Sequence, residues 1–388
     1  MITMYTRLLP LPQHSFFLFG PRGTGKTTWL RMVLGNARWF DLLRSTDLLK
    51  LMRNPDQFRF EVEALEKGSW IVVDEIQKWP PLLNEIHSLI ADYGDKYRFA
   101  LSGSSARKLK RLDANLLAGR VINRKFFSLT GAELNYRFHT DDLLKYGALP
   151  KVCADQENRV DILEAYVANY LKEEIQQEAL VQNLASFSRF LEVAAIMNGQ
   201  VVNVSNIARD AGVARPTVQR YFETLMDTLI GFWLPAWKPR AKVKEVSHPK
   251  FYFFDPGVVR AIQNRLREPL ESAERGALLE TLVLHEIRSW MNISGCGGEL
   301  YYWRTPNQTE IDFVWMRGKK AIGFEVKAAT VWKKEYSSVL NQRFQEKLLQ
   351  KCFGIYLGDA RLKDHEVHVL PLKEFMRDIA LGKILNIA

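Results

Sequence analysis

The sequence contains little cysteine and no long apolar segment. Its three cysteines, Cys153, Cys296 and Cys352, are far apart and odd in number, so they form neither a disulfide framework nor a cluster of zinc ligands. No apolar run approaches the ~18 residues of a membrane-spanning helix. Charged residues and prolines also interrupt positions 7–14, where a signal peptide would place its apolar core. These absences exclude secreted, membrane-spanning and zinc-finger proteins, and they indicate the reducing cytoplasm.

An excess of acidic residues is also missing. The 388 residues include 54 Lys and Arg against 44 Asp and Glu, which gives a formal net charge of +10. This balance excludes a disordered acidic protein and favours an anionic partner, with nucleic acid ahead of a membrane surface. The hydrophobic share of 47% is that of an ordinary globular protein. At roughly 100–200 residues per domain, the length predicts two to four domains.

One loop near the start of the sequence matches the phosphate-binding pattern G-x-x-x-x-G-K-[ST]. An apolar run at residues 16–19 precedes it and helical residues follow from Lys26, which is the context that the pattern needs. Small residues let successive backbone N–H groups surround a phosphate, and the helix N-terminus adds its positive dipole. A glycine-rich surface turn is the alternative. The residues expected to bind nucleotide are Gly20, Pro21, Arg22, Gly23, Thr24, Gly25, Lys26, Thr27 and Thr28.

Two acidic residues, Asp74 and Glu75, follow the apolar run at residues 70–73. In parallel sheets, ligands bind at this end of a strand. We assign Asp74 and the Thr27 hydroxyl to Mg²⁺, and Lys26 to the β- and γ-phosphate oxygens of ATP. Glu75 would orient or deprotonate the attacking water. The alternative is that both acids cap a following helix.

Further polar residues follow the next apolar run, at residues 98–101. The hydroxyl of Ser102 is placed to contact the γ-phosphate or the attacking water. Arg107 and Arg120 come later, and either is a candidate arginine finger, which would neutralise charge on the transferred phosphoryl group. Residues 104–126 hold seven Lys or Arg and one Asp, so a solvated basic face competes equally with the finger role.

Strand-like and helical segments alternate up to residue 131. The strand-like runs lie at residues 16–19, 37–40, 70–73 and 97–101, and the helical stretches lie at 42–52, 58–66 and 82–91. This alternation predicts a parallel sheet with crossover helices. The expected fold class is multidomain α/β, with a P-loop ATPase domain at 1–131, a helical lid or linker at 132–199, a winged helix at 200–268 and an α+β domain at 269–388.

These motifs resemble the AAA-type ATPases of bacteria and archaea that join an N-terminal P-loop domain to a C-terminal domain of long-unknown function. The resemblance covers most of the chain. It rests on the phosphate loop, on VDEIQ at residues 73–77, LSGSS at 101–105 and LAGR at 117–120, and on the C-terminal motif described below. It implies an additional-strand P-loop fold and ATP hydrolysis coupled to work on another macromolecule.

Residues 200–268 have helix-turn-helix spacing. Ser205 is the expected cap of a short helix at 206–211, residues 212–213 form the turn, and a second helix follows at 214–229. A basic loop at 237–250, between strand-like runs at 230–234 and 251–254, would be the wing. The residues expected to contact phosphates or base edges are Arg215, Thr217, Gln219, Arg220, Lys238, Arg240, Lys242 and Lys244. A winged helix that serves only as a packing module is the alternative.

The C-terminal region carries acids and a lysine on adjoining strand-like runs. Alternation along a strand places Glu325 and Lys327 on one face, and a turn at 316–320 can bring Asp312 beside them. Such a set is what Mg²⁺-dependent phosphodiester cleavage needs. The spacing resembles the core of the restriction-endonuclease-like fold, which includes Holliday-junction resolvases, and its matching positions are Glu280, Asp312, Glu325 and Lys327. A solvent-facing hairpin and a catalytically silent, DNA-binding fold are the alternatives.

The sequence therefore predicts a DNA-associated ATPase that uses ATP and Mg²⁺ to bind or remodel DNA. The further expectation of branched DNA comes only from the resemblance to resolvase-like folds. An ATP-dependent switch that recognises a protein and an ATP-regulated nuclease are the competing interpretations. No membrane partner is expected, and an arginine finger donated by a second copy would require a homo-oligomer.

Overall fold

The structure, a computed structural model, describes residues 5–105, 117, 119–171, 183–239 and 248–386. Four predicted site residues, Arg107, Arg240, Lys242 and Lys244, lie outside these ranges. The chain divides into two compact units. The N-terminal unit comprises Arg7–Phe127 together with Asp227–Ile230, and the C-terminal unit comprises most of the chain from Ser128 onward.

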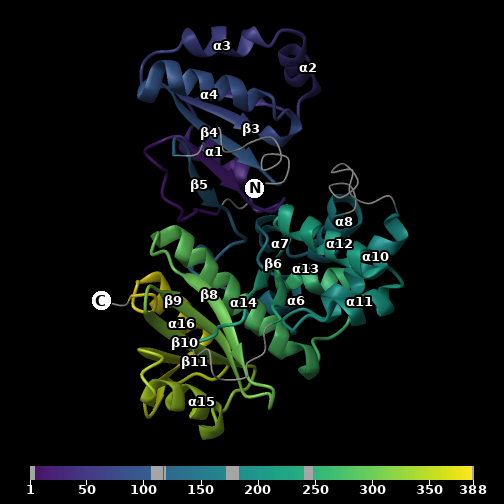
Figure 1. The fold of residues 1–388 in the computed structure, drawn as a ribbon, viewed down its shortest axis with the longest axis vertical. Coiled ribbons are helices and arrows are strands. Elements are labelled where there is room, and N and C mark those ends of the chain that lie inside the picture. The colour runs from purple at the N-terminus through teal and green to yellow at the C-terminus, as the bar shows by residue number, and fades with distance from the viewer. Residues whose placement is uncertain (1–4, 106–116, 118, 172–182, 240–247, 387–388) are drawn as a thin grey trace. The chain divides into compact units, whose positions relative to one another are not determined.

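The N-terminal unit contains a five-stranded parallel sheet in the order β2-β3-β4-β1-β5 (Figure 1). Its strands are β1 (Phe16–Phe19), β2 (Arg38–Asp41), β3 (Trp70–Asp74), β4 (Arg98–Gly103) and β5 (Ile122–Lys125). The sequence predicted the first four but not β5, whose residues are mostly exposed and polar. Because β4 lies between β1 and β3, it is the additional strand that the resemblance implied.

Helices connect these strands and cover the sheet. They are α1 (Lys26–Val33), α2 (Ser45–Arg53), α3 (Asp56–Glu63) and α4 (Leu82–Tyr93), with short 3₁₀ turns at Ile76–Lys78 and Gly94–Lys96. The predicted helices are confirmed, with ends displaced by a few residues. Apolar side chains of the strands pack with Phe58, Val62, Ile86 and Leu89 of α3 and α4 in one buried core. The sheet therefore holds the loops at its carboxyl edge on a rigid base.

The C-terminal unit begins with helices: α6 (Thr140–Tyr146), α7 (Pro150–Ala154), α8 (Arg159–Ala165), one turn of π-helix (Tyr166–Leu171) and α10 (Leu184–Ile196). One face of α10 carries five apolar residues, Phe187, Phe190, Leu191, Ala194 and Ala195, and all five are buried. This face contacts α12 (Arg215–Asp227), since the Phe190 and Phe222 rings meet edge to face at 4.9 Å.

The helix-turn-helix spacing corresponds to α11 (Val204–Ala211) and α12 (Arg215–Asp227), with Gly212 at a φ of +65° between them. The predicted cap was wrong. The Asn203 side chain, not that of Ser205, accepts hydrogen bonds from the backbone N–H groups of Ser205 and Asn206. Asparagine is as good a cap as serine, and the helix therefore begins at Val204.

A short hairpin and a helix follow. The strands β6 (Gly231–Leu234) and β7 (Lys250–Phe253) pair antiparallel, and α13 (Pro256–Ile262) comes next. The residues after β6 attach to the C-terminal sheet, because the N–H of Trp237 donates to the carbonyl of Tyr302 at 2.6 Å and the N–H of Tyr302 donates to Pro235 at 3.0 Å. The described ends of the predicted basic loop are therefore held by other parts of the same unit.

The C-terminal sheet has six strands in the order β12-β13-β11-β10-β9-β8. Its strands are β8 (Glu299–Arg304), β9 (Glu310–Arg317), β10 (Lys320–Lys327), β11 (Lys351–Tyr356), β12 (Leu362–Asp364) and β13 (Val367–Pro371), and its helices are α14 (Ser272–Ser294), α15 (Lys334–Gln345) and α16 (Leu372–Ala380). The strands β8, β9 and β10 form an antiparallel meander, whereas β10, β11 and β13 run parallel. The adjoining strand-like runs predicted around Asp312 and Glu325 correspond to β9 and β10. Within the ranges that the structure covers, no helix combines the length and apolarity needed to cross a membrane.

Candidate nucleotide site

The phosphate loop connects β1 to α1 in a conformation that needs its glycines. Gly23 and Gly25 have φ angles of +77° and +91°, which residues with a side chain rarely adopt. At Gly20 an added Cβ would lie 2.3 Å from the carbonyl oxygen of Phe126. The Thr24 hydroxyl donates to the Pro21 carbonyl at 2.8 Å and fixes the curl of the loop. The backbone geometry therefore requires glycine at Gly20 and Gly25, the first and last glycines of the pattern.

Lys26 is directed back onto this loop. Its ammonium donates to the carbonyl oxygens of Gly20 at 2.7 Å and Pro21 at 3.1 Å, and the side chain is buried. The charge is thus held where the pattern places a phosphate. Arg22 is partly exposed and Thr28 is exposed on α1, so these two predicted residues do not join the buried part of the site.

Three predicted residues from three different elements meet at one carboxylate. The Thr27 hydroxyl donates to Oδ2 of Asp74 at 2.8 Å, and the Ser102 hydroxyl donates to Oδ1. The contact arises because Asp74 and Ser102 stand at the carboxyl ends of the adjacent strands β3 and β4. Burial raises the pKa of Asp74, although the hydrogen bonds from Ser102 and Thr27 oppose this rise.

Glu75 is held in a strained backbone conformation. Its φ of +58° is in the left-handed region, which is uncommon for a residue with a side chain. Its N–H donates to the Ser102 hydroxyl at 3.1 Å. The carboxylate accepts from the Ser104 hydroxyl at 3.2 Å and from the amide of Gln77. Gln77 and Ser104 lie in the motifs at 73–77 and 101–105, but no local pattern predicts their contact with Glu75.

Arg7 is a further residue of the site that sequence reasoning missed. Its guanidinium donates to the carbonyl oxygens of Thr24 at 2.6 Å and Phe127 at 2.8 Å. It also lies 4.0 Å from the centroid of the Phe126 ring, within the range of a cation–π contact. Arg120, the candidate finger within the described residues, is exposed and contacts the His87 ring at 2.6 Å. Its finger role stays a prediction.

A second polar cluster lies in the C-terminal unit, where the hairpin β9–β10 brings the predicted residues together. Oδ2 of Asp312 accepts from the backbone N–H of Val326 at 2.7 Å and lies 3.9 Å from Nζ of Lys327. Lys327 also contacts the carboxylate of Glu325. On α14, Glu280 accepts from the Tyr252 hydroxyl at 2.8 Å. Burial, followed by the charge of Asp312, raises the pKa of Glu280 to about 7.

Lys250 of β7 was not predicted to belong to this cluster. Its Nζ contacts Glu310 and lies 3.8 Å from Oε2 of Glu280, and only 4% of its side chain is exposed. Burial lowers the pKa of Lys250, but the charges of Glu280 and Glu310 outweigh burial and raise it. Across the described ranges, no three Asp, Glu, His or Cys side chains are arranged to hold a metal ion. A metal at Glu280, Asp312 and Glu325 stays a prediction that this geometry does not favour.

The predicted nucleic-acid contacts on α12 face solvent. Arg215, Gln219 and Arg220 are exposed and Thr217 is partly exposed. The opposite face of the helix, including Val218 and Leu225, is buried. Lys238 is exposed as well. The side chains that were predicted to face a partner are therefore accessible, wherever the structure describes them.

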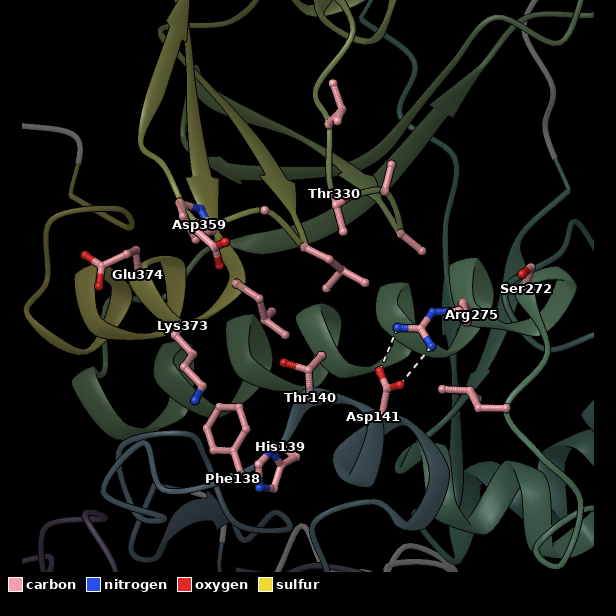
Figure 2. Close-up of a pocket in the computed structure, with 18 of the residues that line it drawn as sticks. Phe138, His139, Thr140, Asp141, Ser272, Arg275, Thr330, Asp359, Lys373 and Glu374 are labelled. Carbon is pink, nitrogen blue, oxygen red and sulfur yellow. Dashed lines mark hydrogen bonds and ion pairs between the residues drawn. The ribbon is translucent and has the colours of Figure 1, made fainter.

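A pocket of about 970 Å³ lies in the C-terminal unit (Figure 2). It is lined by residues that follow the carboxyl ends of β10, β11 and β13 and by the start of α14. Its charged groups largely pair with one another: Arg275 donates twice to Asp141, at 2.6 and 3.1 Å, and Arg377 contacts Glu374. Two of the four Lys and Arg side chains that line the pocket are therefore neutralised by acids of the same lining.

Family comparisons agree with the geometry of the nucleotide site. Residues 13–135 match the family model described as "AAA domain". Residues 137–268 and 275–375 match two models described as domains of unknown function, DUF8612 and DUF4143. The phosphate loop, the Thr27–Asp74 contact and the additional strand agree with this match of residues 13–135 to an AAA domain.

Two mycobacterial proteins resemble the chain along most of its length. The "Uncharacterized protein Rv2008c" of Mycobacterium tuberculosis and the "Uncharacterized protein Mb2031c" of Mycobacterium bovis are each 28% identical to this chain over 379 residues. The match covers 95% of this chain and 80% of each relative. The chain therefore resembles these proteins over both of its units.

Solved structures resemble the chain more distantly. Thermotoga maritima RuvB is 17% identical, with a TM-score of 0.31, and the match covers 57% of this chain and 82% of that one. The Aeropyrum pernix ORC2 protein in its ADP form is 12% identical, with a TM-score of 0.33, and the match covers 66% and 88%. The Bacillus subtilis DNA clamp loader delta protein is 13% identical, with a TM-score of 0.24, and the match covers 70% and 94%.

Proposed function

We propose that this protein hydrolyses ATP at the phosphate loop and uses the nucleotide state to control how it binds or remodels DNA. The hydrolysis part rests on one observation, the 2.8 Å hydrogen bond between the Thr27 hydroxyl and Asp74. A hydroxyl and a carboxylate so placed beside a phosphate-binding loop are the usual protein ligands of nucleotide-bound Mg²⁺ in P-loop enzymes. The Thr27 hydroxyl and the Asp74 carboxylate therefore support the binding of a magnesium nucleotide at this loop.

Each residue of the site has a role in this proposal. The loop N–H groups and Lys26 bind the phosphate oxygens, and Thr27 and Asp74 would hold Mg²⁺, which neutralises phosphate charge when it is bound. Glu75 accepts a proton from the attacking water. Ser102 keeps Asp74 oriented through its hydrogen bond to Oδ1.

The DNA part of the proposal is supported by charge and exposure. The chain carries a net charge of +10, and Arg215 and Arg220 project from the exposed face of α12. The order α11, turn, α12, β6 and β7 is that of a winged helix, in which the second helix contacts DNA. Branched DNA, as in a Holliday junction, is proposed only from the resemblance of the C-terminal motif to resolvase-like folds.

An ATPase assay with a panel of nucleic acids tests the coupling. Turnover would be measured with no DNA, with single strands, with duplex and with four-way junctions, beside a Lys26→Ala control that removes the phosphate contact. We expect at least one DNA structure to change the ATPase rate of the wild-type protein. If every nucleic acid leaves the rate unchanged, the alternative of an ATP-dependent switch with a protein partner is favoured.

A further inference from the structure

We infer that Lys250 is a built-in cation that takes the place of a divalent metal in the acidic cluster of the C-terminal unit. The acidic cluster is defined here as the carboxyl groups of Glu280, Glu310, Asp312 and Glu325. This inference concerns a site remote in sequence from the phosphate loop, and it does not depend on ATP hydrolysis or on DNA binding.

Every carboxyl group of the acidic cluster already has a partner. Lys250 contacts Glu310 and lies 3.8 Å from Glu280, which also accepts from Tyr252 at 2.8 Å. Lys327 contacts Glu325. Oδ2 of Asp312 accepts a hydrogen bond from the backbone N–H of Val326 at 2.7 Å. The remaining oxygen of Glu310 lies 3.4 Å from Nε of Arg304. Three cations of the protein, Lys250, Lys327 and Arg304, thus lie within 3.9 Å of the four acids.

The backbone around Lys250 holds its side chain in place from both sides. Lys250 pairs with Leu234 of β6 and forms a bridge with Val201. Two residues before it, the carbonyl of His248 accepts a hydrogen bond from the Tyr302 hydroxyl. The ammonium also lies 5.4 Å from the centroid of the Tyr302 ring. The charge of Lys250 is therefore a fixed part of the cluster rather than a mobile surface group.

A divalent metal would compete directly with this ammonium. Mg²⁺ takes oxygen ligands at about 2.0–2.1 Å, from one or two carboxylates together with waters. Here at least one oxygen of each carboxyl group is already engaged by a cation of the protein or by the backbone, although Oε2 of Glu325 is buried with no hydrogen-bond partner. A metal added beside a buried ammonium would also be repelled by its charge, which water screens poorly in the interior. Lys250 is in this way the residue that determines which cation the cluster holds.

Manganese binding tests this inference directly. Electron paramagnetic resonance would count the Mn²⁺ bound to the full-length protein without nucleotide, for wild type, Lys250→Met, the double variant Lys250→Met/Asp312→Asn, and Lys319→Met. Lys319 lies in the exposed turn between β9 and β10 and serves as the matched control. The Asp312→Asn change separates binding at the cluster from any binding elsewhere.

We expect Lys250→Met to bind one more Mn²⁺ than wild type, at least about a hundredfold more tightly than the wild-type cluster does. The double variant is expected to lose this ion, and Lys319→Met to match wild type. A folded Lys250→Met protein that binds no additional Mn²⁺ would overturn the inference.

A second measurement keeps the test decisive if Lys250→Met does not fold. Mn²⁺ binding to the wild-type chain is compared with that of Asp312→Asn alone. We expect the two to be equal, since the wild-type cluster holds no metal. An ion that wild type binds and Asp312→Asn loses would show that a metal enters the cluster while Lys250 is present, which contradicts the inference.

Discussion

The guanidinium of Arg7 donates to the carbonyl oxygen of Thr24 in the phosphate loop, at 2.6 Å. The same group donates to Phe127 at 2.8 Å, and Arg7 and Phe127 are the residues at which the chain enters and leaves the main segment of the N-terminal unit. One side chain therefore connects the loop that is proposed to bind ATP with both boundaries of its unit.

The change Arg7→Met should weaken both stability and nucleotide binding. It removes two hydrogen bonds from a charged group, which together contribute about 2–4 kcal/mol to folding. We expect the ATP-domain unfolding temperature to fall and the affinity for Mg²⁺·ATP to drop by about tenfold. Thermal unfolding and nucleotide titration check this. Arg53→Met, on the exposed end of α2, should leave both unchanged, and an equal effect of the two changes would contradict the role of Arg7.

The change Glu75→Gln should separate binding from turnover. Glutamine keeps the shape of the side chain but cannot take a proton from water, and losing a general base costs about 10²–10⁴-fold in rate. We expect kcat to fall by about this factor while the nucleotide affinity stays within about threefold of wild type. Steady-state ATPase assays and titrations measure the two effects. Glu66→Gln, an exposed change in the same unit, is the control, and near-wild-type turnover in Glu75→Gln would remove Glu75 from the mechanism.

The nucleotide site was largely predictable because its residues follow one another in short motifs. The loop at residues 20–27 and the pair at 74–75 each have a local pattern, and the parallel sheet then brings them together. Arg7 and Gln77 were missed because neither contact has a sequence signature. Arg7 reaches Phe127, 120 positions away, and only the folded sheet makes them neighbours.

The residues of the C-terminal cluster were likewise predicted only where they belong to a local sequence pattern. The Glu-x-Lys spacing and the turn after β9 predicted that Asp312, Glu325 and Lys327 meet. The register confirms the pairing, since Phe313 lies opposite Phe324. Lys250 is the first residue of β7, and it was considered only as the last residue of the predicted basic loop. Its contact with Glu280 depends on the packing of that hairpin against α14 and β8, which the sequence does not encode locally.

The buried carboxyl group of Glu286 should make the stability of the protein depend on pH. Glu286 of α14 is 1% exposed and accepts from the N–H of Gly131 at 2.6 Å. Burial raises its pKa to about 8, from 4.5 as an ordinary side chain. The folded state therefore binds this proton more tightly than the unfolded state does. The contribution of this proton to the free energy of unfolding is complete below about pH 4.5 and is lost as the pH rises through about 8.

The change Glu286→Gln should remove this dependence, because glutamine stays neutral and still accepts from Gly131. We expect the variant and wild type to be similarly stable near pH 5 and the variant to be more stable near pH 9, by up to about 4 kcal/mol. Urea unfolding at several pH values measures the difference. A stability difference between the two proteins that is the same at every pH would show that Glu286 ionises normally in the folded state.

Two arginines on α12 should account for part of the DNA affinity. If each neutralises one phosphate, Arg215→Ala and Arg220→Ala should each weaken duplex binding and reduce the slope of log K against log salt by about 0.9. Fluorescence anisotropy titrations across a range of salt measure both quantities. Lys319→Ala is the exposed control on the β9–β10 turn. Slopes that stay at the wild-type value in both arginine variants would place the DNA contact elsewhere.

Calorimetric titration of Mg²⁺ and a non-hydrolysable ATP analogue tests the central claim most directly. The account predicts one binding event per folded chain, which Lys26→Ala weakens strongly and Lys319→Ala leaves intact. Folded wild-type protein that releases or absorbs no heat over this titration at several temperatures, or Lys26→Ala protein that binds the analogue as tightly as wild type, would contradict it.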